Sequence, residues 1–165
     1  MAKETQGRFM VMGRNVFGVL NKILQNQDLL KLLKYTDSDP LSHDDLSQNE
    51  IDEMIGNNIL FTPVIPDEEQ KAQSFLTILF ENYEINDNVD YKNATLRFDI
   101  ICPSNSWVIN DSDLRPFKIM QIIDGMMNGS RLEGIGNLQF KEANIIIPSA
   151  YHTGYMMEYE HSEFN

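Results

Sequence analysis

The segment Asp113–Asn128, DLRPFKIMQIIDGMMN, decides the fold, because it is the clearest helix pattern in the chain and extended segments flank it. Asp113 is placed to cap the first turn, and Pro116 falls inside that turn, where its missing N–H costs little. Asn128 and Gly129 should end the helix, since both residue types accept the left-handed conformation. Apolar side chains recur at three- and four-residue steps and form one broad stripe: Phe117, Ile119, Met120, Ile122, Ile123, Met126 and Met127. We expect this helix to lie on a sheet.

Three shorter helical patterns precede the sheet. An amphipathic helix is expected from Arg8 to about Gln25. It contains Gly13 and Gly18, which cost about 1 kcal/mol each relative to alanine, so we expect another backbone to pack closely there. Asp28 is expected to cap the leucine-rich helix LLKLLKY that follows it. The S-x-x-E sequence at 47–50 is a capping box for a third, short helix.

The strand patterns lie on both sides of the central helix. A short strand is expected at 59–61, and Ser74–Tyr83 is apolar on both faces, which predicts a position in the middle of the sheet or against a neighbouring subunit. Ala94–Cys102 alternates, so one face should be core and the other wet. Leu138–Ile147 and Gly154–Glu160 read as a hairpin. The fold class is therefore α+β: a mostly antiparallel sheet packed by one central helix, about 113–128, with the N-terminal helices as a second layer.

Composition limits the function classes. The 165 residues are 42% hydrophobic and should form a single domain, 1–165, with residues 1–7 flexible and an acidic loop at 36–47. The formal charge, 13 − 25 = −12, disfavours wrapping nucleic acid through its phosphates and suits solubility or a cationic partner. The single cysteine, Cys102, lies in the apolar run FDIIC and is expected to be a buried, inert thiol. We find no signal peptide or membrane span and expect a cytoplasmic site of synthesis.

One loop carries a cluster of carboxylates that hard cations such as calcium could use. Its members are Asp37, Asp39, Asp44 and Asp45. Leu41 stands where an EF-hand requires a ligand, so a solvated acidic loop, or a loop that contacts a partner or lines a lumen, is the simpler interpretation. We expect no metal site there.

No catalytic constellation is apparent. The sequence Gly134-Ile135-Gly136 precedes a strand, whereas a dinucleotide-binding loop must follow one. His43, His152 and His161 lie far apart without partners at ligand spacing and are interpreted as surface or turn histidines. We therefore expect a protein without a catalytic site and without a cofactor.

The strands carry more apolar surface than one helix can cover. The residues in question are Phe75, Leu79, Trp107, Tyr155, Met157 and Tyr159. Either the N-terminal helices form a second layer over them, or they are buried between subunits as an oligomer interface. The pattern leaves both explanations open.

The order of elements resembles the neck proteins of tailed bacteriophages, the tail terminators and tail-completion proteins. The resemblance rests on these segments, in chain order: LLKLLKY, NNILFTPVIPDEEQ, SFLTILFENYEI, NATLRFDIICPSNSWVINDSDLRPFKIMQIIDGMMNG, GNLQFKEANIIIP and YHTGYMMEYEHSEF. It implies a structural protein of the virion that assembles in the bacterial cytoplasm as a homo-oligomeric ring, six- or twelve-fold. Its implied partners are adjacent connector and tail-tube proteins, with only transient passage of DNA and no membrane. The alternatives are a small acidic adaptor or host-takeover protein that binds a cationic protein, and, less favoured, an enzyme whose site assembles from scattered residues.

Overall fold

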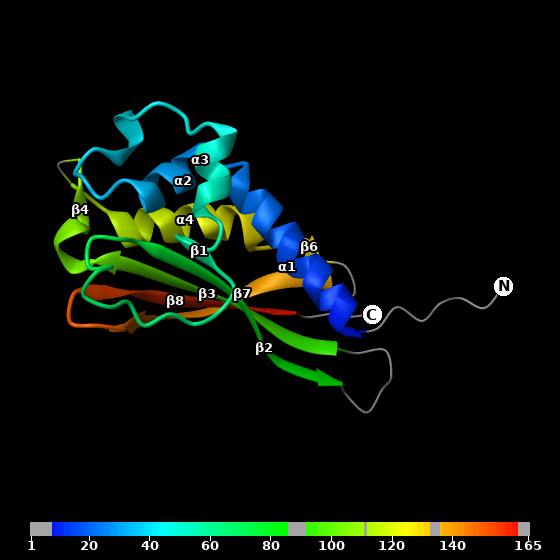
Figure 1. Cartoon of the computed structure of the whole chain (residues 1–165). Coiled ribbons are helices and arrows are strands. Elements are labelled where there is room, and N and C mark those ends of the chain that lie inside the picture. The colour runs from blue at the N-terminus through cyan, green and yellow to red at the C-terminus, as the bar shows by residue number, and fades with distance from the viewer. Residues whose placement is uncertain (1–7, 86–91, 111, 133–135, 162–165) are drawn as a thin grey trace.

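The computed structural model describes residues 8–85, 92–110, 112–132 and 136–161. One layer of helices lies over one face of a curled sheet, as expected for an α+β fold (Figure 1). The sheet order is β1-β2-β3-β8-β7-β6, and every pairing is antiparallel except that of β1 with β2. The elements are α1 Arg8–Leu24, α2 Gln27–Lys34, η1 Pro40–Ser42, α3 Gln48–Met54, β1 Ile59–Leu60, β2 Phe75–Ile85, β3 Lys92–Pro103, η2 Ser104–Ser106, β4 Val108–Ile109, β5 Asp113–Leu114, α4 Arg115–Met127, β6 Arg131–Leu132, β7 Gly136–Ile146 and β8 His152–His161.

Helix α4 lies against β3, β7 and β8, as its broad apolar stripe predicted. Its first turn differs from the expectation: Asp113 does not cap the helix, because its backbone pairs with Ile109 in the small β4–β5 sheet. Leu114 occupies the capping position without a side-chain bond, and Pro116 is in the first turn as predicted. The helix ends before Gly129, whose φ of +77° is a conformation that glycine adopts without strain.

The N-terminal helices form the rest of this layer, beside α4 (Figure 1). The close backbone packing expected at Gly13 and Gly18 is wrong, since a β-carbon at either position would meet nothing within 4 Å. Helix α2 is capped by Asn26, whose side chain accepts a hydrogen bond from the Leu29 N–H at 2.9 Å, and not by Asp28. The capping box at the start of α3 is confirmed.

The core lies between the helices and the helix-facing side of the sheet. Alternate residues of β3 point into it, and α4 contributes Ile119, Ile123 and Met127; the β3 residues are Leu96, Phe98, Ile100 and Cys102. The opposite face of β3 was expected to be wet, yet Thr95, Asp99 and Ile101 are buried there. Long strands pair along both sides of β3 and shield its side chains laterally, so position in the sheet decides their burial.

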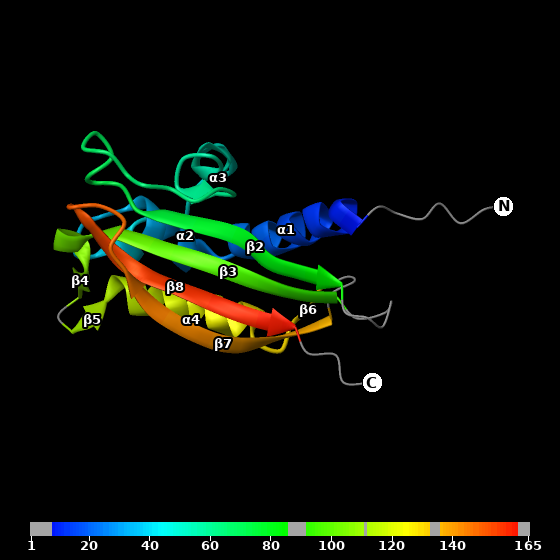
Figure 2. The ribbon, with the colours of Figure 1, turned by 90° about the horizontal axis from the view of Figure 1, so that it is seen from below.

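The opposite face of β2, β3, β8 and β7, which we call the open face, has no described helix over it (Figure 2). Strand β2 does not lie in the middle of the sheet, the first of the two positions expected for it, because its outer neighbour β1 pairs only with Leu76 and Thr77 and most of its length lies at an edge. The other expected position, against a neighbouring subunit, stays a prediction. No helix within the described residues is long and apolar enough to cross a membrane. The fold therefore presents an uncovered sheet face and two partly unpaired sheet edges.

Candidate interaction surfaces

The open face carries a network of ion pairs centred on Arg97 of β3. The Arg97 guanidinium lies 2.7 Å from Asp99 and 3.2 Å from Glu81 on β2. The hydrogen bond and charge of Asp99, with Glu81 and Glu158 nearby, raise the pKa of Arg97. Strand alternation places all these groups on one side of the sheet.

A second group of charges continues the network onto β8 and β7. The Lys141 ammonium lies 2.7 Å from Glu160 and 3.4 Å from Glu158, and Glu142 stands opposite Glu158 in the register. Among the described side chains, the open face thus holds five carboxylates against two cations, Arg97 and Lys141: Glu81, Asp99, Glu142, Glu158 and Glu160. The surplus makes this face acidic, and we call these five residues the acidic sheet face.

The outer edge of β7 is bonded from Gly136 to Phe140, by β6 at its start and then by Asn128, Gly129 and Ser130, and beyond Phe140 no described strand pairs with it. Apolar side chains along this edge are exposed: Ile145 is 59% and Ile147, just beyond the strand, 72% exposed, and Phe140 is exposed as well. The sequence predicted this isoleucine run as the end of a hairpin strand and made no prediction of its exposure. An unpaired strand edge flanked by exposed apolar groups is a common site for a partner chain.

Helix α1 carries a second exposed apolar surface, which we call the α1 stripe: Phe9, Met10, Gly13 and Phe17. Phe9 is 79%, Met10 67% and Phe17 61% exposed. The Phe17 ring lies 6.1 Å from that of Phe61, which follows β1, so the stripe continues onto the β1 side of the sheet. Phe17 is offset on the helix from the buried residues Val19 and Ile23, and that offset is the signal that could have identified this surface.

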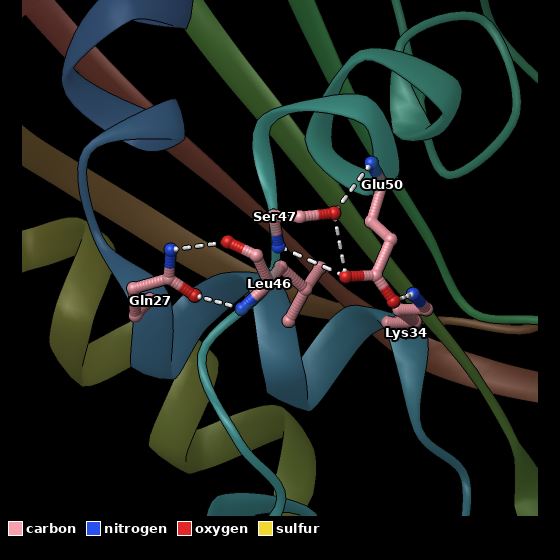
Figure 3. Close-up of polar contacts among 5 residues, drawn as sticks. All are labelled: Gln27, Lys34, Leu46, Ser47 and Glu50. Carbon is pink, nitrogen blue, oxygen red and sulfur yellow. Dashed lines mark hydrogen bonds and ion pairs between the residues drawn. The ribbon is translucent and has the colours of Figure 1, made fainter.

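The acidic loop is ordered by bonds to the helices at its end. Gln27 of α2 exchanges two hydrogen bonds with the backbone of Leu46, at 2.8 and 3.1 Å (Figure 3). Ser47 and Glu50 form the capping box, and Glu50 also pairs with Lys34 of α2 at 2.5 Å (Figure 3). The hydrogen bond from Lys34, with those from Ser47, lowers the pKa of Glu50 to about 2.

Within the loop, two of the four aspartates already have cationic or histidine partners. Asp37 lies 2.8 Å from the His43 ring, and Asp45 lies 2.7 Å from Lys31. Asp39 and Asp44 are exposed. No group of three or more side chains that could hold a metal ion occurs among the described residues. The partners of Asp37 and Asp45 show that these two carboxylates help to hold the loop in place.

Arg115, at the start of α4, is the largest fully buried side chain of the described residues and was not recognised from the sequence. All its partners are backbone carbonyl oxygens: Nε donates to Ser106 at 2.8 Å, Nη1 to Leu32 at 2.8 Å and Tyr35 at 2.5 Å, and Nη2 to Asp37 at 2.5 Å. Burial lowers its pKa. A cation at a helix N-terminus opposes the helix dipole, and this mismatch was the available sequence signal. The carbonyls at the end of α2 compensate, and Arg115 holds α2, the acidic loop and η2 together.

The structure separates the six residues expected to form an oligomer interface. Met157 and Tyr159 are buried beneath the helices, and the Tyr159 hydroxyl donates to Asp124 of α4 at 2.8 Å. Tyr155 packs against Trp107 and Phe117 on the same side. Of the remaining two, Phe75 is buried against His152 and Leu79 is half-buried on the open face. The helix layer therefore covers most of the apolar surplus, and exposed apolar side chains lie elsewhere, among them those of α1 and β7 and the isolated Ile65 and Val108.

The described histidines have structural partners. His43 is a partly exposed loop histidine, as expected; it stacks on Tyr35 with ring centroids 3.8 Å apart and pairs with a carboxylate that the sequence did not indicate as its partner. His152 is buried, not at the surface: its Nε2–H donates to the Gln73 carbonyl at 2.9 Å and Nδ1 lies 2.9 Å from Ser149 Oγ. The ring thus ties the β7–β8 turn to the segment before β2. The His161 side chain lies outside the described residues.

A pocket of about 330 Å³ lies at this end of the sheet, lined by Lys71, Ala72, Ser104, Asn105, Ala150 and Tyr151. Its lining contains neither a carboxylate nor a histidine to act as a general base. The Ser104 hydroxyl lies 3.2 Å from that of Thr153.

Cys102 is buried beneath the helices, and burial raises the pKa of its thiol to about 12, as expected for an inert cysteine.

Comparison with known proteins gave one result. The chain matches the family YomW over residues 26–161, which is most of its length. No curated protein and no solved structure matches it. Because the match extends from α2 to the end of β8, it includes the whole sheet and the acidic loop. The chain therefore belongs to the YomW family, which is phage-derived, and is a phage-associated protein.

Proposed function

We propose that this protein is a non-enzymatic structural protein of the virion, which forms a ring in the neck or tail of a tailed bacteriophage. The ring joins head and tail and lets DNA pass. Membership of a phage-derived family supports this function, as does the resemblance of the element order to neck proteins. Its immediate partners are further copies of itself, six or twelve to a ring by that resemblance, and the adjacent connector and tail-tube proteins.

The observation that carries the proposal is the presence of two different uncovered apolar surfaces on one chain. The α1 stripe lies on the β1 side of the sheet, and the unpaired β7 edge lies on the other side (Figures 1 and 2). A two-fold dimer uses one self-complementary surface, whereas a head-to-tail assembly needs two different ones. When the rotation between neighbours closes, head-to-tail contacts produce a ring.

The negative charge of the chain would let DNA pass without adhering to it. The net charge of −12 and the exposed carboxylates of Asp39 and Asp44 would repel phosphates and prevent adhesion to a lumen. A double substitution, Asp39→Lys with Asp44→Lys, leaves the paired Asp37 and Asp45 in place. We expect folding to be unchanged and phage assembly or DNA passage to be impaired; an unchanged titre would remove the loop from the mechanism.

The proposal is tested by locating the protein and by measuring its mass. Immunogold electron microscopy of purified virions should label the junction of head and tail, and disruption of the gene should leave heads and tails unjoined. Light scattering of the purified protein should detect a ring-sized oligomer. Absence from purified virions, with normal particles made in the disrupted strain, would refute the proposal.

A second candidate function is that of a small acidic adaptor or host-takeover protein. The acidic sheet face, five carboxylates against two cations, favours it because such a surface can bind a cationic protein. This protein would be a monomer or dimer, absent from the virion, and would capture a basic host protein that is released by salt.

A further inference from the structure

Both outermost long strands of the sheet have a stretch of free edge. On the outer side of β2, β1 pairs with Leu76 and Thr77, and no described strand pairs with the residues that follow. On the outer side of β7, no described strand pairs with the residues beyond Phe140. We call residues 78–81 the free β2 edge and residues 142–147 the free β7 edge. The backbone N–H and C=O groups of such edges are ready to pair with another strand.

The backbone groups that point out of each free edge follow from the ladder. In an antiparallel pair, alternate residues bond to the partner strand and the residues between them point away from it. Leu76 points outward, because its N–H donates to the carbonyl that precedes β1 at 2.7 Å, so Ile78 and Phe80 point outward as well. Carried through the registers of β3 and β8, the same alternation makes Ala143 and Ile145 the outward residues of β7.

Two copies can join these edges without turning either sheet over. Strands β2, β3, β8 and β7 alternate in direction, so β7 of one copy is antiparallel to β2 of a copy placed beside it in the same orientation. The outward residues of both edges have their side chains on the helix side, where Ile78, Phe80 and Ala143 pack against the core. Pairing therefore keeps helix layer beside helix layer and open face beside open face.

The exposed apolar side chains of the two edges lie in this same helix layer. Helix α1 packs on β2 and extends beyond it in the view from below, which brings the α1 stripe to this edge (Figure 2). On β7, the Phe140 ring contacts that of Tyr159 and Ile145 stands opposite Tyr155, so both lie on the helix side. Joining the edges therefore places the α1 stripe of one copy beside the exposed apolar residues of the next.

We infer that the free β7 edge of one copy pairs antiparallel with the free β2 edge of the next copy, and that the α1 stripe packs against Phe140, Ile145 and Ile147 in the same contact. The contact is heterologous, so one sheet continues from copy to copy. It rests on the proposed ring and names the surfaces that build it. Because β1 covers the start of β2 and β6 covers the start of β7, neighbouring copies are displaced by a few residues along the strands.

A second copy in this arrangement covers both exposed apolar surfaces, whereas other occupants cover one. A two-fold pairing of β7 with β7, or an extended peptide of another protein on β7, leaves the α1 stripe and the free β2 edge uncovered. At about 150–250 Å² per ring, the exposed parts of Phe9, Phe17 and Phe140 offer on the order of 300–450 Å². That is about a quarter of the roughly 1,600 Å² that a stable interface buries, before the isoleucines, Met10 and two strand backbones are counted.

Cross-linking tests the pairing, because Cys102 is the single cysteine of the chain and is buried. A variant with both Leu79→Cys and Asn144→Cys carries one new thiol on the open face of each edge strand. Within one copy these positions are three strand spacings apart, about 14 Å, so a shorter bismaleimide joins only different copies. Head-to-tail pairing should give a ladder of dimers, trimers and larger species.

The matched control moves the second thiol from position 144 to Gln139→Cys, which is exposed on the same face of β7 but lies beside the covered part of its edge. Species larger than a dimer should be at least about tenfold more abundant with position 144 than with 139. Equal ladders, or no ladder with 144, would overturn the inference. Efficient dimer formation by Asn144→Cys alone would show two-fold pairing of β7 and would overturn it as well.

Substitutions at Ala143 test whether backbone hydrogen bonds make the contact. Proline removes the outward N–H and keeps the bonds to β8, as proline does on the outer side of edge strands, whereas serine keeps the N–H. Ala143→Pro should reduce the ladder by about tenfold or more and Ala143→Ser by less than about threefold, with folding verified by thermal unfolding. If the proline variant fails to fold, Ile145→Lys, at a position that is 59% exposed, should give the same loss.

Equal effects of proline and serine, or an unchanged ladder with Ile145→Lys, would overturn the pairing. If virions carry the protein at the neck but the ladder is absent, the pairing of these edges is wrong and the proposed function stands. Absence from virions refutes the function itself.

Discussion

Replacing Arg115 with methionine removes a buried cation while keeping a long apolar side chain. Four carbonyl oxygens lose a donor, and those of Ser106 and Leu32 lie in buried surroundings. An unsatisfied buried acceptor costs about 1–3 kcal/mol, so these two together cost about 2–6 kcal/mol. The half-buried carbonyls of Tyr35 and Asp37 can bind water instead.

Part of that cost is offset, because the variant no longer has to desolvate a guanidinium, the effect that lowers the pKa of Arg115. We expect a net loss of about 3 kcal/mol in the free energy of unfolding. For a chain of this size, each kcal/mol corresponds to about 2–4 °C, so Tm should fall by about 6–12 °C. Arg115→Lys should recover only part of this, since an ammonium cannot reach carbonyls spread around a planar guanidinium.

Urea denaturation and thermal unfolding followed by circular dichroism measure both quantities. The matched control is Lys118→Met on the same helix. The ammonium of this half-buried side chain lies 3.8 Å from Asp113, and the pair should contribute less than about 1 kcal/mol. A loss below about 1 kcal/mol for Arg115→Met would show that Arg115 does not hold α2, the acidic loop and η2 together.

Three further predictions concern single positions. The hydrogen bond from Lys34 lowers the pKa of Glu50 to about 2 from 4.5, so the stabilisation from this pair is present above about pH 4.5 and is lost as the pH falls towards 2. Glu50→Gln should flatten the dependence of Tm on pH over this window. An unchanged dependence would contradict the pairing. Gly154→Ala places a β-carbon onto a backbone oxygen of β3 and should lower the free energy of unfolding by about 3 kcal/mol or more, whereas Gly13→Ala should raise it by roughly 0.5–1 kcal/mol. Denaturant midpoints compare the two variants, and equal effects would count against the register of β3 with β8. Cys102 should react with a thiol reagent only after unfolding, so native-state labelling at neutral pH would disprove its burial.

Local patterns were sufficient to predict most elements. The spacing of apolar residues identified α1, α4 and the long strands, because the periods of a helix and a strand differ. The Ser47–Glu50 capping box was also predictable, since its residues are neighbours in the chain. Where backbone pairing competed with a local signal, the local prediction was wrong. Asp113 was predicted to cap α4, but its backbone pairs with Ile109 and it belongs to strand β5.

The candidate surfaces were less predictable, because exposure depends on which element covers which. Tyr155, Met157 and Tyr159 were apolar strand residues that a subunit or a helix could have buried, and the helix layer lies over them. The isoleucines at the end of β7 are as apolar as a core strand, yet no strand or helix of the described residues covers that part of the edge. Residues of the same type therefore have opposite roles at the centre and at the edge of one sheet.

The sequence by itself determined the α+β class, the order of the helices and strands, the acidic charge and the inert cysteine, since these follow from composition and short-range periodicity. Only the tertiary structure decided the strand order, the burial of Arg115 among carbonyls 78 to 83 residues earlier in the chain, and the separation of the α1 stripe from the β7 edge. Contacts over such distances depend on how the whole chain packs, and no local pattern encodes them.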